Sequence, residues 1–174
     1  AHLWRYTPWP RIHPTKVEEL PEADGISFTV EGHEEAPFTR DDISADIARV
    51  FLQELKGSSQ RLTINGTGET IHVHARASGH VAVGHLDLTV KGDATVLIHL
   101  TGESGWCGLH ITGTVHPNAN LGFGFINELD ANTKLLRCDD SIVERDASFE
   151  SATLSVGGFN CKFDLRTTLN RTGS

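Results

Sequence analysis

The sequence contains no methionine, only three cysteines and no hydrophobic run long enough to span a membrane. The cysteines, Cys107, Cys138 and Cys161, are too few and too odd in number for a disulfide framework, and no C-x-x-C motif suggests a zinc ribbon or an iron–sulfur cluster. Positive charge is also scarce: the formal net charge is −8, and lysine and arginine form no block that would attract a nucleic-acid backbone. We therefore expect partners other than nucleic acid and membrane.

The first ten residues lack the basic start and apolar run of a secretory signal peptide. Together with the few cysteines, this predicts a reducing, cytoplasmic location. Hydrophobic residues make up 38% of the chain, which is enough for a packed core and excludes global disorder. The length of 174 residues indicates one domain, or one domain with a small appendage.

Residues 1–58 are predicted to form a small N-terminal α/β segment. Five of the six prolines lie before residue 39, so this part is expected to be irregular apart from a strand over residues 26–30. A helix is predicted over residues 39–56, beginning at Thr39 and stopped by Gly57. Its apolar positions recur at helical spacing: Ile43, Ile47, Val50, Phe51 and Leu55. We expect this helix to pack on the rest of the protein, where it can cover one end of the repeats that follow.

A repeated pattern fills residues 59–174. Each repeat holds strand-forming residues, then a polar turn, then a small residue that leads into the next strand, and its apolar anchors are Ile64, Val90, Val115, Val143 and Leu169. The anchors are 26, 25, 28 and 26 residues apart. Two extended runs of about eight residues plus two turns use up that length at roughly 3.3 Å per residue. The spacing predicts a parallel β-helix, a solenoid with coils of ~26 residues; an antiparallel meander is the competing interpretation.

Stacking in register would sort the side chains of such a solenoid into columns. Counting in twos from the anchors predicts two inward columns: Val90, Val115, Val143 and Leu169, and Leu86, Ile111, Asp139 and Leu165. Asp139 is the one member that does not suit a core. The chain stops at residues 170–174, inside a turn just after a repeat begins, and lacks an initial methionine. These features predict a portion of a longer protein, truncated at the C-terminal end of the solenoid.

The same counting predicts an outward ladder that contains residues of metal-binding types. His85, His110, Cys138 and Asp164 each lie five residues before an anchor. Adjacent coils are about 4.8 Å apart, so His85, His110 and Cys138 are candidate ligands of a shared zinc or iron ion. The alternative is a column of solvent-facing polar residues, and nothing in the sequence selects this column over its neighbours.

A second candidate metal pair is His72 and His74, which would point to one face of a strand. The segment from Gly66 to His74 resembles the first metal-binding motif of cupins, but the expected glutamate is replaced by Ser78 or Gly79. A metal-dependent cupin-type enzyme is therefore the alternative function. Nucleophile-elbow, phosphate-loop and dinucleotide-binding motifs are missing. The paired acids Asp139-Asp140 are interpreted as turn residues.

Several segments resemble the SufB/SufD family of iron–sulfur cluster assembly scaffold proteins, and SufD more closely. They lie at both ends and through the middle of the chain, in the family's order: Trp4-Arg5-Tyr6-Thr7, GDATV from Gly92 to Val96, IVERDASFESATLSVGG from Ile142 to Gly158, and KFDLRTTL from Lys162 to Leu169. The resemblance implies a right-handed parallel β-helix core.

The resemblance also implies a function. It predicts a non-catalytic scaffold subunit of the SUF machinery that pairs with a SufB-like subunit and a SufC-like ABC ATPase, or with a second copy of itself. An iron–sulfur cluster or iron would then belong to the full complex, with no cofactor held by this segment. The family's residues for cluster assembly are expected beyond residue 174, so none is assigned to a position here. A carbohydrate-active β-helix is a weaker alternative, since such proteins expose aromatic platforms and this chain has one tyrosine.

Overall fold

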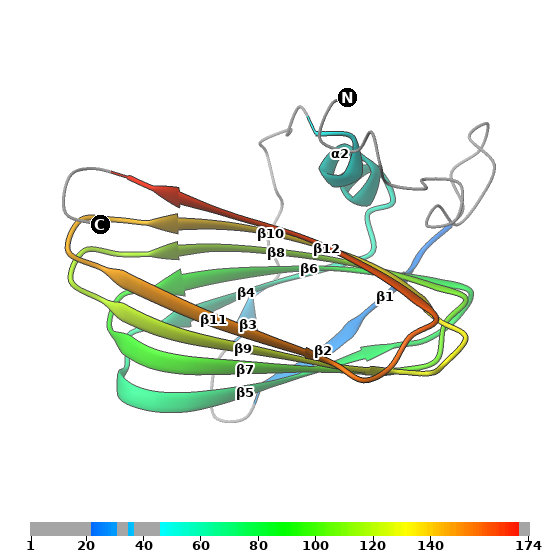
Figure 1. Cartoon of the computed structure of the whole chain (residues 1–174), viewed down its shortest axis with the longest axis horizontal. Coiled ribbons are helices and arrows are strands. Elements are labelled where there is room, and N and C mark those ends of the chain that lie inside the picture. Colours follow the sequence, from blue (N-terminus) through cyan, green and yellow to red (C-terminus); the bar gives the residue numbers. More distant parts are fainter. Residues whose placement is uncertain (1–21, 31–34, 37–45, 171–174) are drawn as a thin grey trace.

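The computed structural model describes residues 22–30, 35–36 and 46–170 of the chain. These residues form two facing β-sheets and one helix (Figure 1). Sheet A runs in the order β12-β10-β8-β6-β4-β3, with β1 also paired to β6: β1 (Asp24–Gly25), β3 (Glu35–Ala36), β4 (Ser58–Ile64), β6 (Val81–Val90), β8 (Trp106–Val115), β10 (Lys134–Val143) and β12 (Asn160–Leu169). Sheet B runs in the order β11-β9-β7-β5-β2: β2 (Ser27–Val30), β5 (Thr67–Ala77), β7 (Asp93–Gly102), β9 (Asn120–Leu129) and β11 (Ser148–Ser155). The helix is α2 (Ile47–Glu54).

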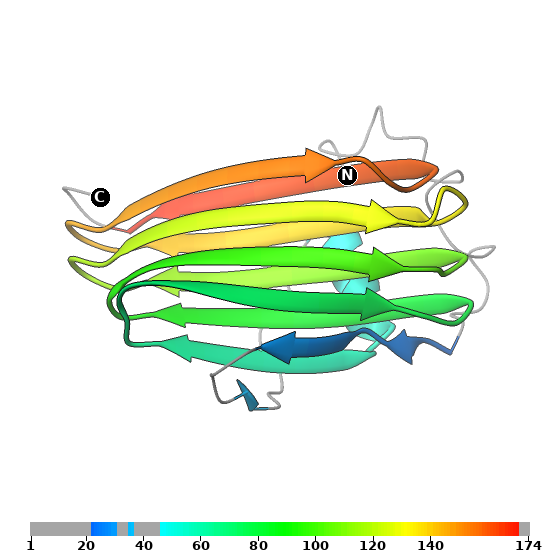
Figure 2. The ribbon, with the colours of Figure 1, turned by 90° about the horizontal axis from the view of Figure 1, so that it is seen from below.

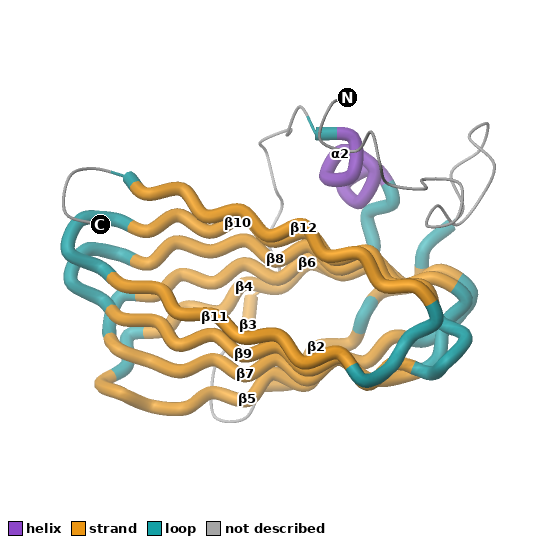
Figure 3. The backbone as a smooth tube through the Cα atoms, viewed as in Figure 1, coloured by secondary structure: helices purple, strands orange, loops and turns teal. Residues whose placement is uncertain are grey.

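The chain from β4 onward is a parallel β-solenoid of about four turns with coils of ~26 residues. Each coil contributes one strand to each sheet, and successive coils pair in parallel (Figure 3). The five predicted anchors are register partners in one column: Ile64, Val90, Val115, Val143 and Leu169. The solenoid prediction is confirmed, and the antiparallel meander is excluded. The first coil begins at Ser58, next to the predicted boundary at residue 59.

The core lies between the two sheets, where alternate side chains from every coil meet. Val90, Val115 and Val143 are buried there as predicted. Leu165 and Leu169 are aligned with their columns but are 50% and 61% exposed. Their coil is the last one described, so their inward faces have no further described coil above them.

Short N-terminal strands cover the other end of the solenoid. β2 pairs antiparallel with β5, and β3 pairs antiparallel with β4. In each sheet, the strand of the first coil therefore has a partner on its outer edge. Figure 2 shows the coils stacked in chain order away from this end. The expectation that the helix covers the end of the repeats is wrong: α2 packs on the outer face of sheet A instead (Figure 1).

The helix begins later than predicted. Asp46 is its N-cap, with an extended backbone and a side chain that accepts hydrogen bonds from the amides of Ala48 and Arg49. The proposed start at Thr39 lies outside the described residues, as does the Trp4-to-Thr7 motif. Ile47, placed on the buried stripe by its spacing, is exposed, and Arg49 is buried.

The helix ends at a left-handed turn, where Lys56 and Gly57 both have positive φ. This agrees with the stop predicted at Gly57. In the part of the chain that the structure describes, no helix combines the length and the hydropathy needed to cross a membrane.

Candidate functional site

The four residues of the predicted outward ladder lie in register on sheet A. His85 is opposite His110, His110 is opposite Cys138, and Cys138 is opposite Asp164. The rings of His85 and His110 meet edge to face, with centroids 5.8 Å apart. The repeat spacing therefore aligned these side chains correctly.

Helix α2 covers this ladder, so the interpretation of a solvent-facing column is wrong. His85, His110 and Cys138 are 6%, 2% and 0% exposed. The helix approaches the sheet closely at Gly108, where an added Cβ would lie 2.4 Å from Cδ2 of Leu52. Apolar contacts between the helix and the outer face of sheet A then bury the surface, including an edge-to-face contact of Phe51 and Trp106 with ring centroids 5.7 Å apart.

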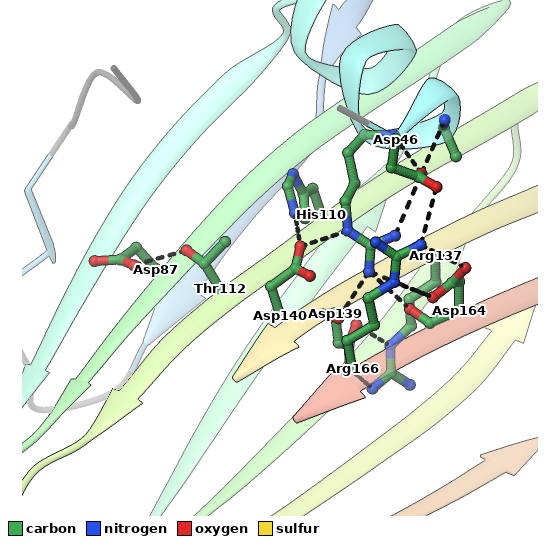
Figure 4. Close-up of polar contacts among 11 residues, drawn as sticks. Asp46, Asp87, His110, Thr112, Arg137, Asp139, Asp140, Asp164 and Arg166 are labelled. Carbon is green, nitrogen blue, oxygen red and sulfur yellow. Dashed lines mark hydrogen bonds and ion pairs between the residues drawn. The ribbon is translucent and has the colours of Figure 1, made fainter. Parts of the chain in front are cut away.

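Arg49 fastens the helix to the sheet through its buried guanidinium group. Its Nε donates to Oδ2 of Asp140 at 2.6 Å, and its Nη2 donates to the backbone carbonyl of Asp139 at 3.0 Å. Weaker contacts of 3.4 Å reach the carboxylates of Asp46 and Asp164. One cation from the helix therefore bridges two neighbouring coils, β10 and β12. Its carboxylate partners Asp46, Asp140 and Asp164 are labelled in Figure 4.

A second arginine completes this cluster from the last coil. Nη2 of Arg166 donates to Oδ2 of Asp46 at 2.9 Å, while its Nε donates to Asp164 at 3.1 Å. Asp46 thus caps the helix with one oxygen and binds the sheet with the other. We call these five residues the helix clamp: Asp46, Arg49, Asp140, Asp164 and Arg166.

The clamp shifts the pKa of Asp140 and of its two arginines toward their charged forms. Burial alone would raise the pKa of Asp140, but hydrogen bonds from His110, at 2.8 Å, and Arg49 hold that pKa well below its usual value. Burial alone would lower the pKa of Arg49, but its hydrogen bond to Asp140 and the nearby carboxylates raise it. The clamp is therefore an ionic network at neutral pH.

A separate ion pair lies inside the solenoid. Both Nε and Nη2 of Arg137 donate to the carboxylate of Asp139, and the guanidinium carbon lies 3.8 Å from the ring centroid of Phe125. Nη1 of Arg137 also donates to Oγ1 of Thr153 at 3.2 Å. Burial raises the pKa of Asp139 above its usual value, and Arg137 opposes that rise.

Both acids of the Asp139-Asp140 pair lie within β10, so their interpretation as turn residues is wrong. Successive strand residues face opposite sides, which sends Asp139 into the core and Asp140 toward the helix. The sequence contains one indication of the inner ion pair: Arg137 and Asp139 are two residues apart in a strand, so their side chains lie on the same face.

The ladder is poorly suited to catalysis by its thiol. Burial raises the pKa of Cys138 to about 12, and the charge of Arg49 offsets this only in part. A thiol is neither a strong nucleophile nor a metal ligand until it loses its proton. The described residues include no group of three or more His, Cys, Asp or Glu side chains placed to hold a metal ion. The metal site at His85, His110 and Cys138 stays a prediction.

The histidines of the cupin-like segment lie on β5 and point away from the core. His72 and His74 are both exposed on the outer face of sheet B. A cupin barrel is an antiparallel jelly roll, whereas β5 pairs in parallel with β7. Among the described residues, the surroundings of these two histidines therefore give no support to a cupin-type centre.

Comparison with protein-family models, curated proteins and solved structures finds no match for this chain. The proposals below therefore rest on its own residues and fold.

Proposed function

We propose that this protein is a non-catalytic scaffold of cytoplasmic iron–sulfur cluster assembly. In this role it pairs with a SufB-like subunit and recruits a SufC-like ATPase. Support for the identity of the partners comes from the resemblance of the segments around Gly92–Val96 and Ile142–Leu169 to the SufB/SufD family. Support for the mode of action comes from the fold.

A solenoid suits a scaffold because stacked coils form a stiff body with long edges. Here the clamp ties helix α2 to coils far from it in the sequence, and Arg137 in the interior connects β10 to Thr153 on β11. Because these polar groups bind one another, they hold the helix and the described coils together as one support. Such a body can position other proteins without chemistry of its own.

The observation that carries the proposal is the exposed apolar surface of the last described coil. Seven large hydrophobic side chains are exposed in the described part of the chain, and five of them belong to residues 154–169. They are Leu154, Val156, Phe159, Leu165 and Leu169. β11 and β12 are also the final strands of their sheets, so each has an edge that pairs with no other described strand. Apolar side chains beside such an edge favour the addition of a further strand, from a following coil or from a partner such as a SufB-like subunit.

Co-purification tests this proposal directly. The tagged protein, in the length at which its cell makes it, is expected to retain a SufB-like subunit and a SufC-like ATPase. The double variant Leu154→Asp/Phe159→Asp places two charges at exposed apolar positions of this coil and should lose the SufB-like subunit. Ile142→Asp is the matched control, because Ile142 is an exposed apolar strand residue outside residues 154–169, and it should retain both partners.

Two results would refute the scaffold assignment. One is a protein that stays alone at every salt concentration tested. The other is turnover of a small substrate by the protein with a bound metal ion, and that activity would favour the enzyme alternative.

A further inference from the structure

Two histidines from neighbouring coils lie side by side on the outer face of sheet B. His74 on β5 and His99 on β7 are register partners in a parallel pair of strands. Their ring centroids are 6.2 Å apart, and the ring planes are tilted by 55°. His72, two residues before His74 on the same face, is instead opposite Leu97. Of the two histidines on β5, only His74 therefore has a histidine partner on the next coil.

A carboxylate on the third coil orients one of these rings. Nε2 of His99 lies 2.6 Å from Oε2 of Glu128 on β9. When Nε2 carries the proton and donates it to this carboxylate, the lone pair of the ring is on Nδ1. Histidine ligands of metal ions commonly have this arrangement, because a carboxylate at the other nitrogen fixes the tautomer and makes the ligand more basic.

We propose that His74 and His99 form a binding site for one late first-row divalent metal ion such as Zn²⁺, with Glu128 as the positioning residue of His99. His74 is exposed and His99 is partly buried, and side chains on the outer face of parallel strands ~4.8 Å apart can rotate until one nitrogen of each ring lies at the roughly 2.0 Å bonding distance of a common ion. Water completes the coordination. The site thus takes two ligands from the described chain, which is consistent with the lack of any described group of three.

This site differs from both sets of ligands that the sequence suggested, although it shares His74 with the pair His72 and His74. The ladder of His85, His110 and Cys138 is buried under α2, whereas His74 and His99 face outward on the opposite sheet. The proposal does not depend on the scaffold function, because it requires no partner protein. With two protein ligands in contact with water, the site should bind reversibly in the micromolar range, far more weakly than a closed structural zinc site.

Calorimetric titration of the untagged protein with ZnCl₂ near neutral pH tests the site. The unsubstituted protein should bind zinc, and His74→Ala and His99→Ala should each weaken that binding by at least about tenfold. Glu128→Gln should weaken it by roughly tenfold while both ligands remain.

His116→Ala is the matched control. His116 is also paired with a glutamate, with Nδ1 3.2 Å from Glu144, but the ring contacts of the described residues include none between His116 and a second histidine. This variant should bind zinc as the unsubstituted protein does. The proposal is overturned if no zinc binds up to roughly millimolar concentration, if either His74→Ala or His99→Ala leaves the affinity unchanged, or if His116→Ala causes the same loss. Thermal melts of each variant show whether the fold is intact.

Discussion

Removal of the Arg49 side-chain charge should release helix α2 from the solenoid. The variant Arg49→Met keeps most of the apolar stem but leaves the Asp140 carboxylate without the donor that lies 2.6 Å away. It also removes the donor to the carbonyl of Asp139. Breaking a buried ion pair by deleting one partner costs about 3–5 kcal/mol, because the remaining charge is stranded.

The lower end of that range applies here. Arg49 is 1% exposed, but the side chains of Asp140 and Asp164 are 28% and 19% exposed, so water can solvate them partly after the substitution. We therefore expect a loss of about 3 kcal/mol. If the helix opens without unfolding of the coils, amide exchange in residues 50–54 should become about a hundredfold faster, since each tenfold change corresponds to about 1.4 kcal/mol.

Hydrogen exchange measured by mass spectrometry, with urea unfolding in parallel, provides the assay. Arg61→Met is the control, because Arg61 forms an exposed pair with Asp87 at 2.7 Å and such pairs contribute about 0–1 kcal/mol. Arg49→Lys keeps the charge without the planar fork and should fall between the two. Adding Asp140→Asn to Arg49→Met should restore part of the loss by neutralising the stranded acid. Equal exchange of α2 in Arg49→Met and Arg61→Met would refute the clamp.

Three further outcomes are expected. The pKa of Asp140 is held below its ordinary value of 3.8, so its ionised form stabilises the fold above about pH 4, and this stabilisation is lost as the pH falls below that value. Asp140→Asn should therefore reduce the fall in the free energy of unfolding with decreasing pH, measured by urea unfolding at a series of acidic pH values. An unchanged pH dependence would contradict this. Burial raises the pKa of the Cys107 and Cys138 thiols to about 12, so a thiol reagent near pH 8 should label the native protein mainly at Cys161. Cys161→Ser should remove that labelling, and labelling that persists in this variant would show that the buried thiols react. Leu109→Ala in the core should cost about 2–5 kcal/mol in urea unfolding, whereas Leu154→Ala at an exposed position should cost less than about 0.5; similar losses would place Leu109 outside the core.

The stacking of the coils was accessible from the sequence because a parallel solenoid repeats the same environment once per coil. Val90, Val115 and Val143 could be aligned by counting, since one inward position in each coil meets the same position above and below. The outward ladder followed from the same arithmetic. What counting cannot provide is the identity of whatever covers the outer face, because that depends on contacts between distant segments.

The site shows this limit most clearly at Arg49. A charged residue on an amphipathic helix is ordinarily assigned to the solvent face, and the spacing of Ile47 suggested the opposite orientation. The observed orientation follows from features on the sheet: Gly108 leaves room for Leu52, and Asp140 offers a carboxylate to the arginine. Asp140 is 91 residues from Arg49 in the chain. No local pattern connects the two.

Adjacent acids in β10 show how the fold gives one dipeptide two electrostatic roles. Asp139 faces the core, where burial raises its pKa and a single arginine, Arg137, compensates for its charge. Asp140 faces the helix, where Arg49 and His110 lower its pKa. Because strand geometry alternates the two faces, the pair connects the interior of the solenoid to its outer cover within one strand. In the scaffold role that we propose, this connection should make the coils and the helix that covers them respond to a partner as one body.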